Sequence, residues 1–201
     1  MPDPREAILE VFREAGALLE GHFLLSSGLH SPKYLQCALV LQDPARAERL
    51  CSRLARAFAD ERVETVVGPA MGGILVAYEL ARALGARAIF AEREEGRMRL
   101  RRGFRIEPRE RVLLAEDVVT TGGSLREVLA LVREAGAEVV GVAALVDRTS
   151  GRESGFGMPL TALVHLDVPT HVPEECPLCR EGLPLVSPGR TGKKRCFEPR
   201  P

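Results

Sequence analysis

An α/β fold, with a mostly parallel sheet flanked by helices, is predicted by two features of this 201-residue sequence. Short apolar runs alternate along the chain with longer stretches in which apolar residues recur at helical spacing. The short runs are continuously apolar, which is typical of strands that helices cover on both faces. The runs predicted as strands are residues 63–68, 87–91, 111–115, 138–146 and 161–166.

Helix signals separate these runs. Apolar residues recur at helical spacing from Ile8 to Ala15, and residues 23–41 then read as two short strands, or a strand and a loop, around a turn. Asp43 and Pro44 supply an N-cap and a first-turn proline for a second helix. Two further helices are predicted to begin near residues 72–73 and 123–124. We expect one domain over residues 1–185 and a flexible tail over residues 186–201, where the chain is rich in proline, glycine and basic residues.

The composition argues against two classes of partner. A formal net charge of +0 provides no general attraction to nucleic acid or to anionic membranes. No apolar run reaches the ~20 residues that cross a bilayer. The first ten residues, MPDPREAILE, carry acids where a secretory signal has basic residues. We therefore expect a cytoplasmic protein that binds neither nucleic acid nor membrane.

The segment VLLAEDVVTTGGSL, residues 112–125, carries the strongest functional signal. Ligands of an open parallel sheet bind beyond the C-terminal ends of its strands. The unpaired N–H groups of the following helix, together with its dipole and nearby hydroxyls, favour a phosphate at this position. The residues predicted to bind it are Val118, Val119, Thr120, Thr121, Gly122, Gly123 and Ser124.

Glu116 and Asp117 need a different partner, because carboxylates repel a phosphate dianion. Two sugar hydroxyls can donate hydrogen bonds to them, and a divalent cation can offset their charge. A ribose 5-phosphate meets both demands. The GxxxxGK[ST] pattern of a nucleotide-binding P-loop is absent from the sequence.

The segment resembles the phosphoribosyl pyrophosphate (PRPP) motif of the type I phosphoribosyltransferases. GHFLLSSGLHSPKY, VVGPAMGG, AEREEGRMRLRRGF and LVDR follow the order and spacing of the orotate phosphoribosyltransferases, from about Glu10 to Leu185. The resemblance implies a type I phosphoribosyltransferase fold, with a small hood built from about residues 1–40 and a C-terminal segment. It implies synthesis of orotidine 5′-phosphate and pyrophosphate from orotate and PRPP. It also implies Mg²⁺ as a cofactor, bound through PRPP, with Glu116 and Asp117 as candidate protein ligands.

The resemblance extends to residues outside the motif. It implies that Ala70, Met71 and Gly72 line the pyrophosphate with their backbones, although some relatives carry a lysine where this chain has Gly72. Residues 92–104 match a mobile loop that, in a homodimer, completes the active site of the neighbouring subunit. Arg93, Arg97 and Arg99 of this segment are therefore predicted to bind PRPP, with Arg99 standing where the family has a histidine. The alternation around Met98 is equally typical of an exposed hairpin. The predicted catalytic residues are Glu116, Asp117, Arg93 and Arg97.

The same resemblance predicts an orotate site. Arg148 follows a predicted strand, where its guanidinium would hold the orotate carboxylate, and Thr120 is the second candidate. Ser26 and Tyr34 align with the segment that caps the base, although Tyr34 fits a core position equally well. Two rival functions remain open at this point. One is a purine phosphoribosyltransferase of the same fold, and the other is a non-catalytic PRPP-sensing regulator that binds nucleic acid.

Cys176 and Cys179 have the CxxC spacing of half a zinc site. A second pair with matching spacing is missing, and only His171 and Cys196 are nearby in the sequence. We therefore expect reduced thiols in a tight turn. Surface or structural roles are expected for the histidines, which are His22, His30, His165 and His171.

Overall fold

The computed structural model of the chain describes residues 4–25, 27–151 and 155–188. The chain divides into two compact units. The larger unit is formed by Met1–Leu18 and Gln36–Asp167, and the smaller by Leu19–Leu35 and Val168–Pro201. The N-terminal helix α1 (Pro4–Glu14) thus belongs to the larger unit.

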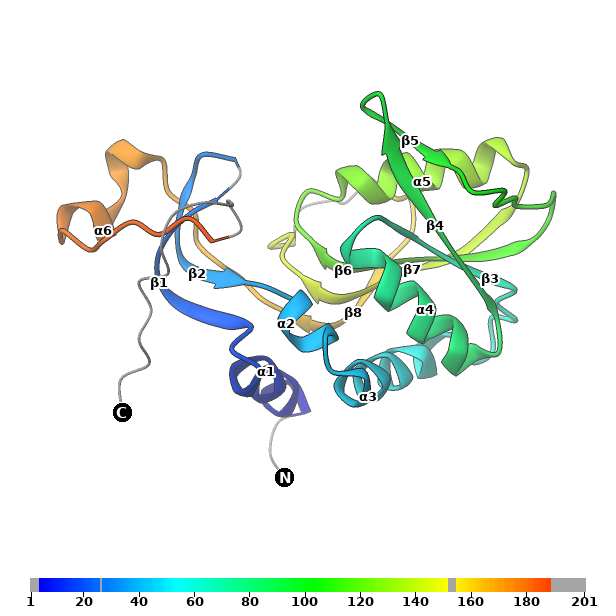
Figure 1. Cartoon of the computed structure of the whole chain (residues 1–201), viewed down its shortest axis with the longest axis horizontal. Coiled ribbons are helices and arrows are strands. Elements are labelled where there is room, and N and C mark those ends of the chain that lie inside the picture. The colour runs from blue at the N-terminus through cyan, green and yellow to red at the C-terminus, as the bar shows by residue number, and fades with distance from the viewer. Residues whose placement is uncertain (1–3, 26, 152–154, 189–201) are drawn as a thin grey trace. The chain divides into compact units, whose positions relative to one another are not determined.

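A six-stranded sheet forms the centre of the larger unit, in the order β5-β4-β3-β6-β7-β8 (Figure 1). Its strands are β3 (Thr65–Pro69), β4 (Arg87–Glu94), β5 (Arg97–Leu100), β6 (Arg111–Val119), β7 (Glu138–Asp147) and β8 (Leu160–His165). Neighbouring strands are parallel, except that β5 pairs antiparallel with β4. The predicted mostly parallel α/β sheet is confirmed, and β5 is an edge strand in the segment where the sequence left a hairpin and a loop as alternatives.

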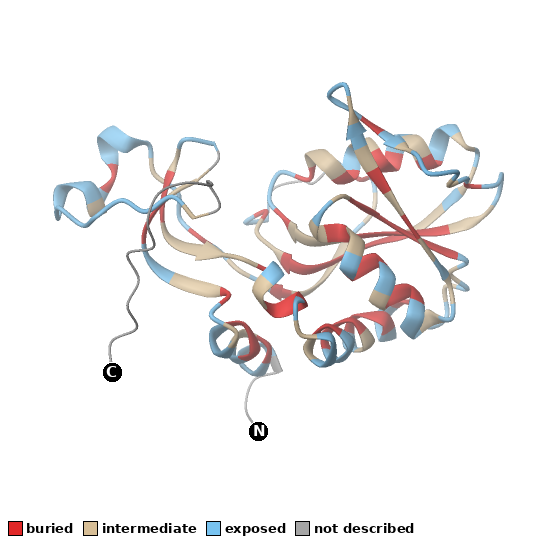
Figure 2. Cartoon of the chain, in the orientation of Figure 1, coloured by how far each residue is buried: buried red, intermediate tan, exposed pale blue. Residues whose placement is uncertain are grey.

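Helices cover both faces of this sheet, which is why its central strands are continuously apolar. Residues Val112–Ala115 of β6 are fully buried, and Figure 2 shows the buried centre of the sheet in red. Successive side chains of a strand point to opposite faces of the sheet. On one face, Val112 and Leu114 pack with the apolar side of α5 (Gly123–Glu134). On the other side lie α3 (Pro44–Ala55) and α4 (Gly72–Leu84), preceded by the short helix α2 (Ala38–Leu41). Gly141 in β7 is needed because a Cβ there would lie 2.5 Å from the ring of Phe58, in the 3₁₀ turn η1 (Arg56–Phe58).

Local signals account for the start of α3. The Asp43 carboxylate accepts hydrogen bonds from the backbone N–H groups of Ala45 at 3.0 Å and Arg46 at 3.4 Å, and Pro44 occupies the first turn. These bonds satisfy donors that have no acceptor inside the helix. The N-cap and proline predicted from the sequence are both present.

The smaller unit contains the hairpin β1 (Leu18–Leu24) and β2 (His30–Leu35), the 3₁₀ turn η2 (Pro173–Glu175) and the short helix α6 (Pro177–Arg180). The C-terminal segment pairs with the hairpin through backbone bridges, from Val186 to Phe23 and from His171 to His30. Residues 189–201, most of the predicted tail, lie outside the described residues. No described helix has the length and apolar character needed to cross a membrane.

Candidate active site

Glu116 and Asp117 lie near the C-terminal end of β6, where the chain leaves the sheet for α5. The pKa of Glu116 is raised to about 9, chiefly by burial and secondly by the charge of the neighbouring Asp117. Burial also raises the pKa of Asp117, although the Val118 N–H donates to its Oδ1 at 2.8 Å. In the ligand-free protein at neutral pH, Glu116 therefore keeps its proton.

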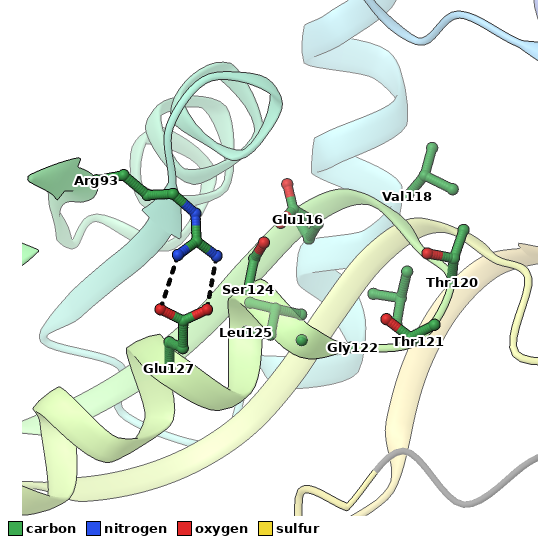
Figure 3. A pocket seen from close by; sticks show the side chains of 11 residues that line it. Arg93, Glu116, Val118, Thr120, Thr121, Gly122, Ser124, Leu125 and Glu127 are labelled. Atoms are coloured by element: carbon green, nitrogen blue, oxygen red, sulfur yellow. Dashed lines mark hydrogen bonds and ion pairs between the residues drawn. The ribbon is translucent and has the colours of Figure 1, made fainter. Parts of the chain in front are cut away.

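The turn after these acids encloses a hollow of ≈ 210 Å³ (Figure 3). Gly122 makes the turn possible because its φ is +74°, and a Cβ there would lie 2.9 Å from the Phe156 ring. Helix α5 begins at Gly123, so its first N–H groups have no acceptor within the helix. The predicted motif residues that line the hollow are Glu116, Val118, Val119, Thr120, Thr121, Gly122, Gly123 and Ser124.

Arg93 lines the same hollow from β4 and is held by Glu127 of α5 (Figure 3). The guanidinium donates one hydrogen bond to each carboxylate oxygen of Glu127, at 3.0 Å from Nη1 and 2.6 Å from Nη2. This ion pair lowers the pKa of Glu127. The sequence analysis did not single out Glu127. The available signal was its position three residues after Ser124, which places both side chains on one face of the predicted helix.

The glycine-rich turn between β3 and α4 packs against the two acids. A Cβ on Gly72 would lie 2.5 Å from the Asp117 carboxyl group, and one on Gly73 would lie 3.1 Å from Glu116 Oε1. The peptide bond between Ala70 and Met71 is cis, and Met71 is 82% exposed. The turn thus places its backbone beside the acids because residues 72 and 73 have no side chains.

Arg148 lies beside this region at the end of β7. Its backbone N–H donates to the Val119 carbonyl at 2.8 Å, so Arg148 and Thr120 stand at the ends of neighbouring strands. Burial lowers the pKa of the half-buried Arg148, and its Nε–H finds no hydrogen-bond acceptor among the described residues. A buried cationic donor without a partner is costly, which indicates a place for an anionic ligand group.

The residues that flank Arg148 have structural partners. Asp147 accepts a hydrogen bond from the Thr149 N–H at 2.7 Å and pairs with His165 Nδ1 at 2.8 Å. Burial, followed by the charges of Asp117 and Glu116, raises the pKa of the Cys37 thiol well above its usual value, while the Arg148 charge opposes the shift. Cys37 therefore lies within electrostatic reach of both acids and of Arg148.

Arg97 and Arg99 are exposed on β5, which forms a regular hairpin with β4. Glu95 and Gly96 connect the strands with φ values of +50° and +80°, the signs that a two-residue hairpin turn requires. Several arginines of the segment pair with acids of the same hairpin: Arg99 with Glu94 at 3.4 Å, Arg101 with Glu94 at 3.1 Å, and Arg102 with Glu92 at 3.1 Å. Residues 92–100 thus have the hairpin form that the sequence analysis kept as an alternative to a loop.

Two predicted orotate-site residues fall in the smaller unit. Tyr34 packs its ring against Phe23, with 5.7 Å between centroids, and burial raises the pKa of its hydroxyl. Ser26 lies outside the described residues.

Comparison with known proteins identifies the family of this chain. Residues 40–155 match the model of the phosphoribosyl transferase domain. The orotate phosphoribosyltransferase of Caldicellulosiruptor bescii is 56% identical over 189 residues, which cover 94% of this chain and 99% of that relative. The orotate phosphoribosyltransferase of Thermotoga maritima is 50% identical over 187 residues, 93% of this chain and 100% of that relative. The chain therefore belongs to the phosphoribosyltransferase family and, within it, to the orotate phosphoribosyltransferases.

Solved structures agree with this family assignment. The crystal structure of orotate phosphoribosyltransferase from Aeropyrum pernix aligns with a TM-score of 0.64 at 27% identity, covering 79% of this chain and 93% of that one. An adenine phosphoribosyltransferase from Rhodothermus marinus aligns with a TM-score of 0.65 at 23% identity, covering 80% of this chain and 99% of that one. At that identity, the second likeness shows the fold alone.

Proposed function

We propose that this protein transfers the phosphoribosyl group of PRPP to orotate, giving orotidine 5′-phosphate and pyrophosphate in pyrimidine synthesis in the cytoplasm. The observation that carries the proposal is the end of β6, where two buried acids stand beside a hollow lined by the first residues of α5. The 5-phosphate binds at the turn Thr121–Ser124, and the two ribose hydroxyls donate to Glu116 and Asp117. The backbone of Ala70, Met71 and Gly72 lines the pyrophosphate.

The carboxyl groups of the site would repel this ligand if all were charged. Glu127 is neutralised by Arg93, and Glu116 by the proton it keeps at neutral pH. Hard oxygen donors such as Glu116 and Asp117 fit Mg²⁺, which would reach the site with PRPP. When bound, the ion would offset the charge of the departing pyrophosphate.

Orotate binds with its carboxylate on Arg148, whose buried Nε–H has no acceptor in the part of the chain that the structure describes, and with Thr120 as a second donor. The anionic N1 of orotate attacks C1 of the ribose, a new C–N bond forms, and the C–O bond to pyrophosphate breaks. No group on the protein has to accept a proton, because orotate enters as the N1 anion. The protein contributes alignment of the two substrates and positive charge, from Arg93 among others, near the leaving group.

A homodimer would supply the remaining positive charge. Arg93 lines the hollow of its own chain, whereas Arg97 and Arg99 are exposed on the hairpin. We propose that these two arginines serve the site of a second copy. Mixing an inactive Asp117→Asn chain with an inactive Arg97→Ala chain would then restore about a quarter of wild-type activity, because half of the dimers carry one intact site. No recovery above the separate variants would contradict this arrangement.

The deciding experiment follows the loss of orotate absorbance after the protein is mixed with orotate, PRPP and Mg²⁺. Turnover with orotate, and not with hypoxanthine or adenine, is the expected result. Asp117→Asn should keep the far-ultraviolet circular dichroism of the wild type and lose turnover by about 10²-fold or more. Preference for a purine would identify the rival transferase. Absence of turnover together with a gel shift on nucleic acid would favour the regulator.

A further inference from the structure

Four side chains that the proposed reaction does not use converge in the smaller unit. They are His22 on β1, His30 on β2, and Cys176 and Cys179 at the start and within α6. One ligand atom from each residue lies within 4.8 Å of the others. His22, His30 and Cys176 are buried, while Cys179 is exposed.

The distances between these atoms fit a tetrahedral metal site. Cys176 Sγ and Cys179 Sγ lie 3.6 Å and 3.7 Å from His22 Nε2, Cys179 Sγ lies 3.2 Å from His30 Nδ1, and the two ring nitrogens are 2.9 Å apart. Tetrahedral Zn²⁺, with bonds of about 2.3 Å to sulfur and 2.0 Å to nitrogen, places sulfur and nitrogen about 3.5 Å apart and two nitrogens about 3.3 Å apart. Each of these four separations is thus within about 0.4 Å of the tetrahedral value.

A hydrogen bond outside the cluster orients His22 as a ligand. Its Nδ1 lies 2.9 Å from the Leu183 carbonyl oxygen. A carbonyl only accepts, so Nδ1 carries the proton and Nε2 directs a lone pair toward the two sulfurs. Metal-binding histidines usually donate their second ring nitrogen in this way. Two backbone hydrogen bonds between His30 and His171, of 2.8 Å and 2.9 Å, hold the start of β2, the strand that carries the second histidine.

The smaller unit has little apolar core of its own. Among its described residues, the buried apolar side chains are Phe23, Val168 and Cys176, and His22, His30 and Ser31 are buried beside them. Its exposed large apolar residues are Val172, Leu183, Leu185 and Val186. Units of this size usually need disulfides or metal ions because they bury too little apolar surface.

We propose that His22, His30, Cys176 and Cys179 bind one structural Zn²⁺ ion, which joins the β1–β2 hairpin to the C-terminal segment. Two histidine nitrogens and two cysteine sulfurs in tetrahedral arrangement select zinc among the common divalent ions. Both thiols lose their protons on binding, so two thiolates neutralise the ion. Protein side chains occupy all four coordination positions of the ion, which is typical of a structural rather than a catalytic zinc site.

The proposed site differs from the sequence prediction of reduced thiols in a tight turn, and the two cysteines form no disulfide in the structure. Of the two ligand candidates considered there, His171 bridges to His30 through its backbone and lies outside the cluster, and Cys196 lies outside the described residues. The missing pair is His22 and His30, which face each other across the hairpin.

Metal analysis of the full-length protein, purified without chelator or histidine tag, tests the proposal. We expect about one zinc per wild-type chain. Cys176→Ser/Cys179→Ser and His22→Ala should carry about ten-fold less metal, since two or one of the ligands are gone. Cys51→Ala and His171→Asn remove the same residue types outside the cluster and should retain it. Zinc in the double-cysteine variant equal to wild type would overturn the assignment.

A second measurement on wild-type protein decides the matter if the ligand variants fail to fold. Titration with a mercurial that caps thiols should release the zinc to a coloured chelator. Refolding or exchange with Co²⁺ should give the strong visible bands of a tetrahedral site with cobalt–sulfur charge transfer. Protein expressed with added zinc that contains only traces of metal, shows no such bands, or carries a Cys176–Cys179 disulfide by mass would refute the site. None of these readouts depends on turnover of orotate.

Discussion

Replacing Glu116 by glutamine should remove a large part of the pH dependence of stability of the ligand-free, Mg²⁺-free protein. The folded protein holds the Glu116 pKa at about 9, against 4.5 for an unperturbed glutamate, chiefly through burial. The folded state therefore binds the proton more tightly than the unfolded state. Stability associated with this group is fully present below pH 4.5 and is lost as the pH rises toward 9.

The size of the effect follows from the two pKa values. Between them, each pH unit costs about 1.4 kcal/mol, so a rise from pH 5.5 to pH 7.5 removes up to about 3 kcal/mol from the free energy of unfolding. Glutamine has the same shape and cannot ionise, so Glu116→Gln should lack this loss. Titrating groups that do not interact with Glu116 are common to both proteins and cancel in the difference.

Urea unfolding followed by far-ultraviolet circular dichroism, at several pH values from 5.5 to 8.5, measures the difference. The stability of Glu116→Gln relative to wild type should rise steadily with pH across this range. Glu134→Gln, which alters an exposed carboxylate on α5, is the matched control and should follow the wild-type curve. Parallel curves for wild type and Glu116→Gln would refute the reasoning, because Glu116 would then be ionised in the folded protein.

Three further predictions concern single contacts of the site. Gly72→Ala should lower the free energy of unfolding, measured by thermal melts, by about 1–3 kcal/mol, because its methyl would lie 2.5 Å from the Asp117 carboxyl. The control Gly123→Ala, whose methyl meets its nearest atom at 3.7 Å, should change stability little. Equal effects of the two substitutions would count against the clash. Arg93→Lys should raise KM for PRPP by about 10-fold, because lysine keeps the charge but cannot make the bidentate contact with Glu127. Arg53→Lys on α3 is the control. Unchanged PRPP kinetics in Arg93→Lys would remove Arg93 from the site. Arg148→Met should raise KM for orotate by about 10–100-fold without lowering the melting temperature, because the Nε–H it removes has no acceptor among residues 4–25, 27–151 and 155–188. A loss of stability with unaltered orotate kinetics would make Arg148 a structural residue.

The predictions from sequence that succeeded rest on neighbours in the chain. Asp43 and Pro44 predicted the start of α3 because an N-cap acts on N–H groups two and three residues away. The strand, acids and glycines of residues 112–125 likewise predicted a turn that the structure contains. The β4–β5 hairpin was open to the same reasoning, since Glu95-Gly96 between alternating residues is a two-residue turn signal.

The features that sequence reasoning missed depend on contacts between distant residues. Cys176 and His22 are 154 positions apart, and no local spacing rule relates them. The pairing of Arg93 with Glu127 joins β4 to α5 across 34 positions. That the Arg148 Nε–H is buried and has no acceptor among the described residues can be seen only in the folded structure. The sequence shows which chemical group each of these side chains carries, but it does not show which distant residue that group contacts.

Gly72 shows how one position governs the charge balance of the whole pocket. A lysine there would bring a positive charge next to Asp117, but its Cβ would first have to occupy the space 2.5 Å from that carboxyl. Glycine leaves the backbone close to the acids and leaves the negative charge without that counter-ion. The protein then neutralises its pocket in two other ways, by the proton that burial keeps on Glu116 and by the Arg93 fork on Glu127. Gly72 is the first residue of α4, and burial, the main cause of the raised Glu116 pKa, keeps the proton on the acid beside this turn.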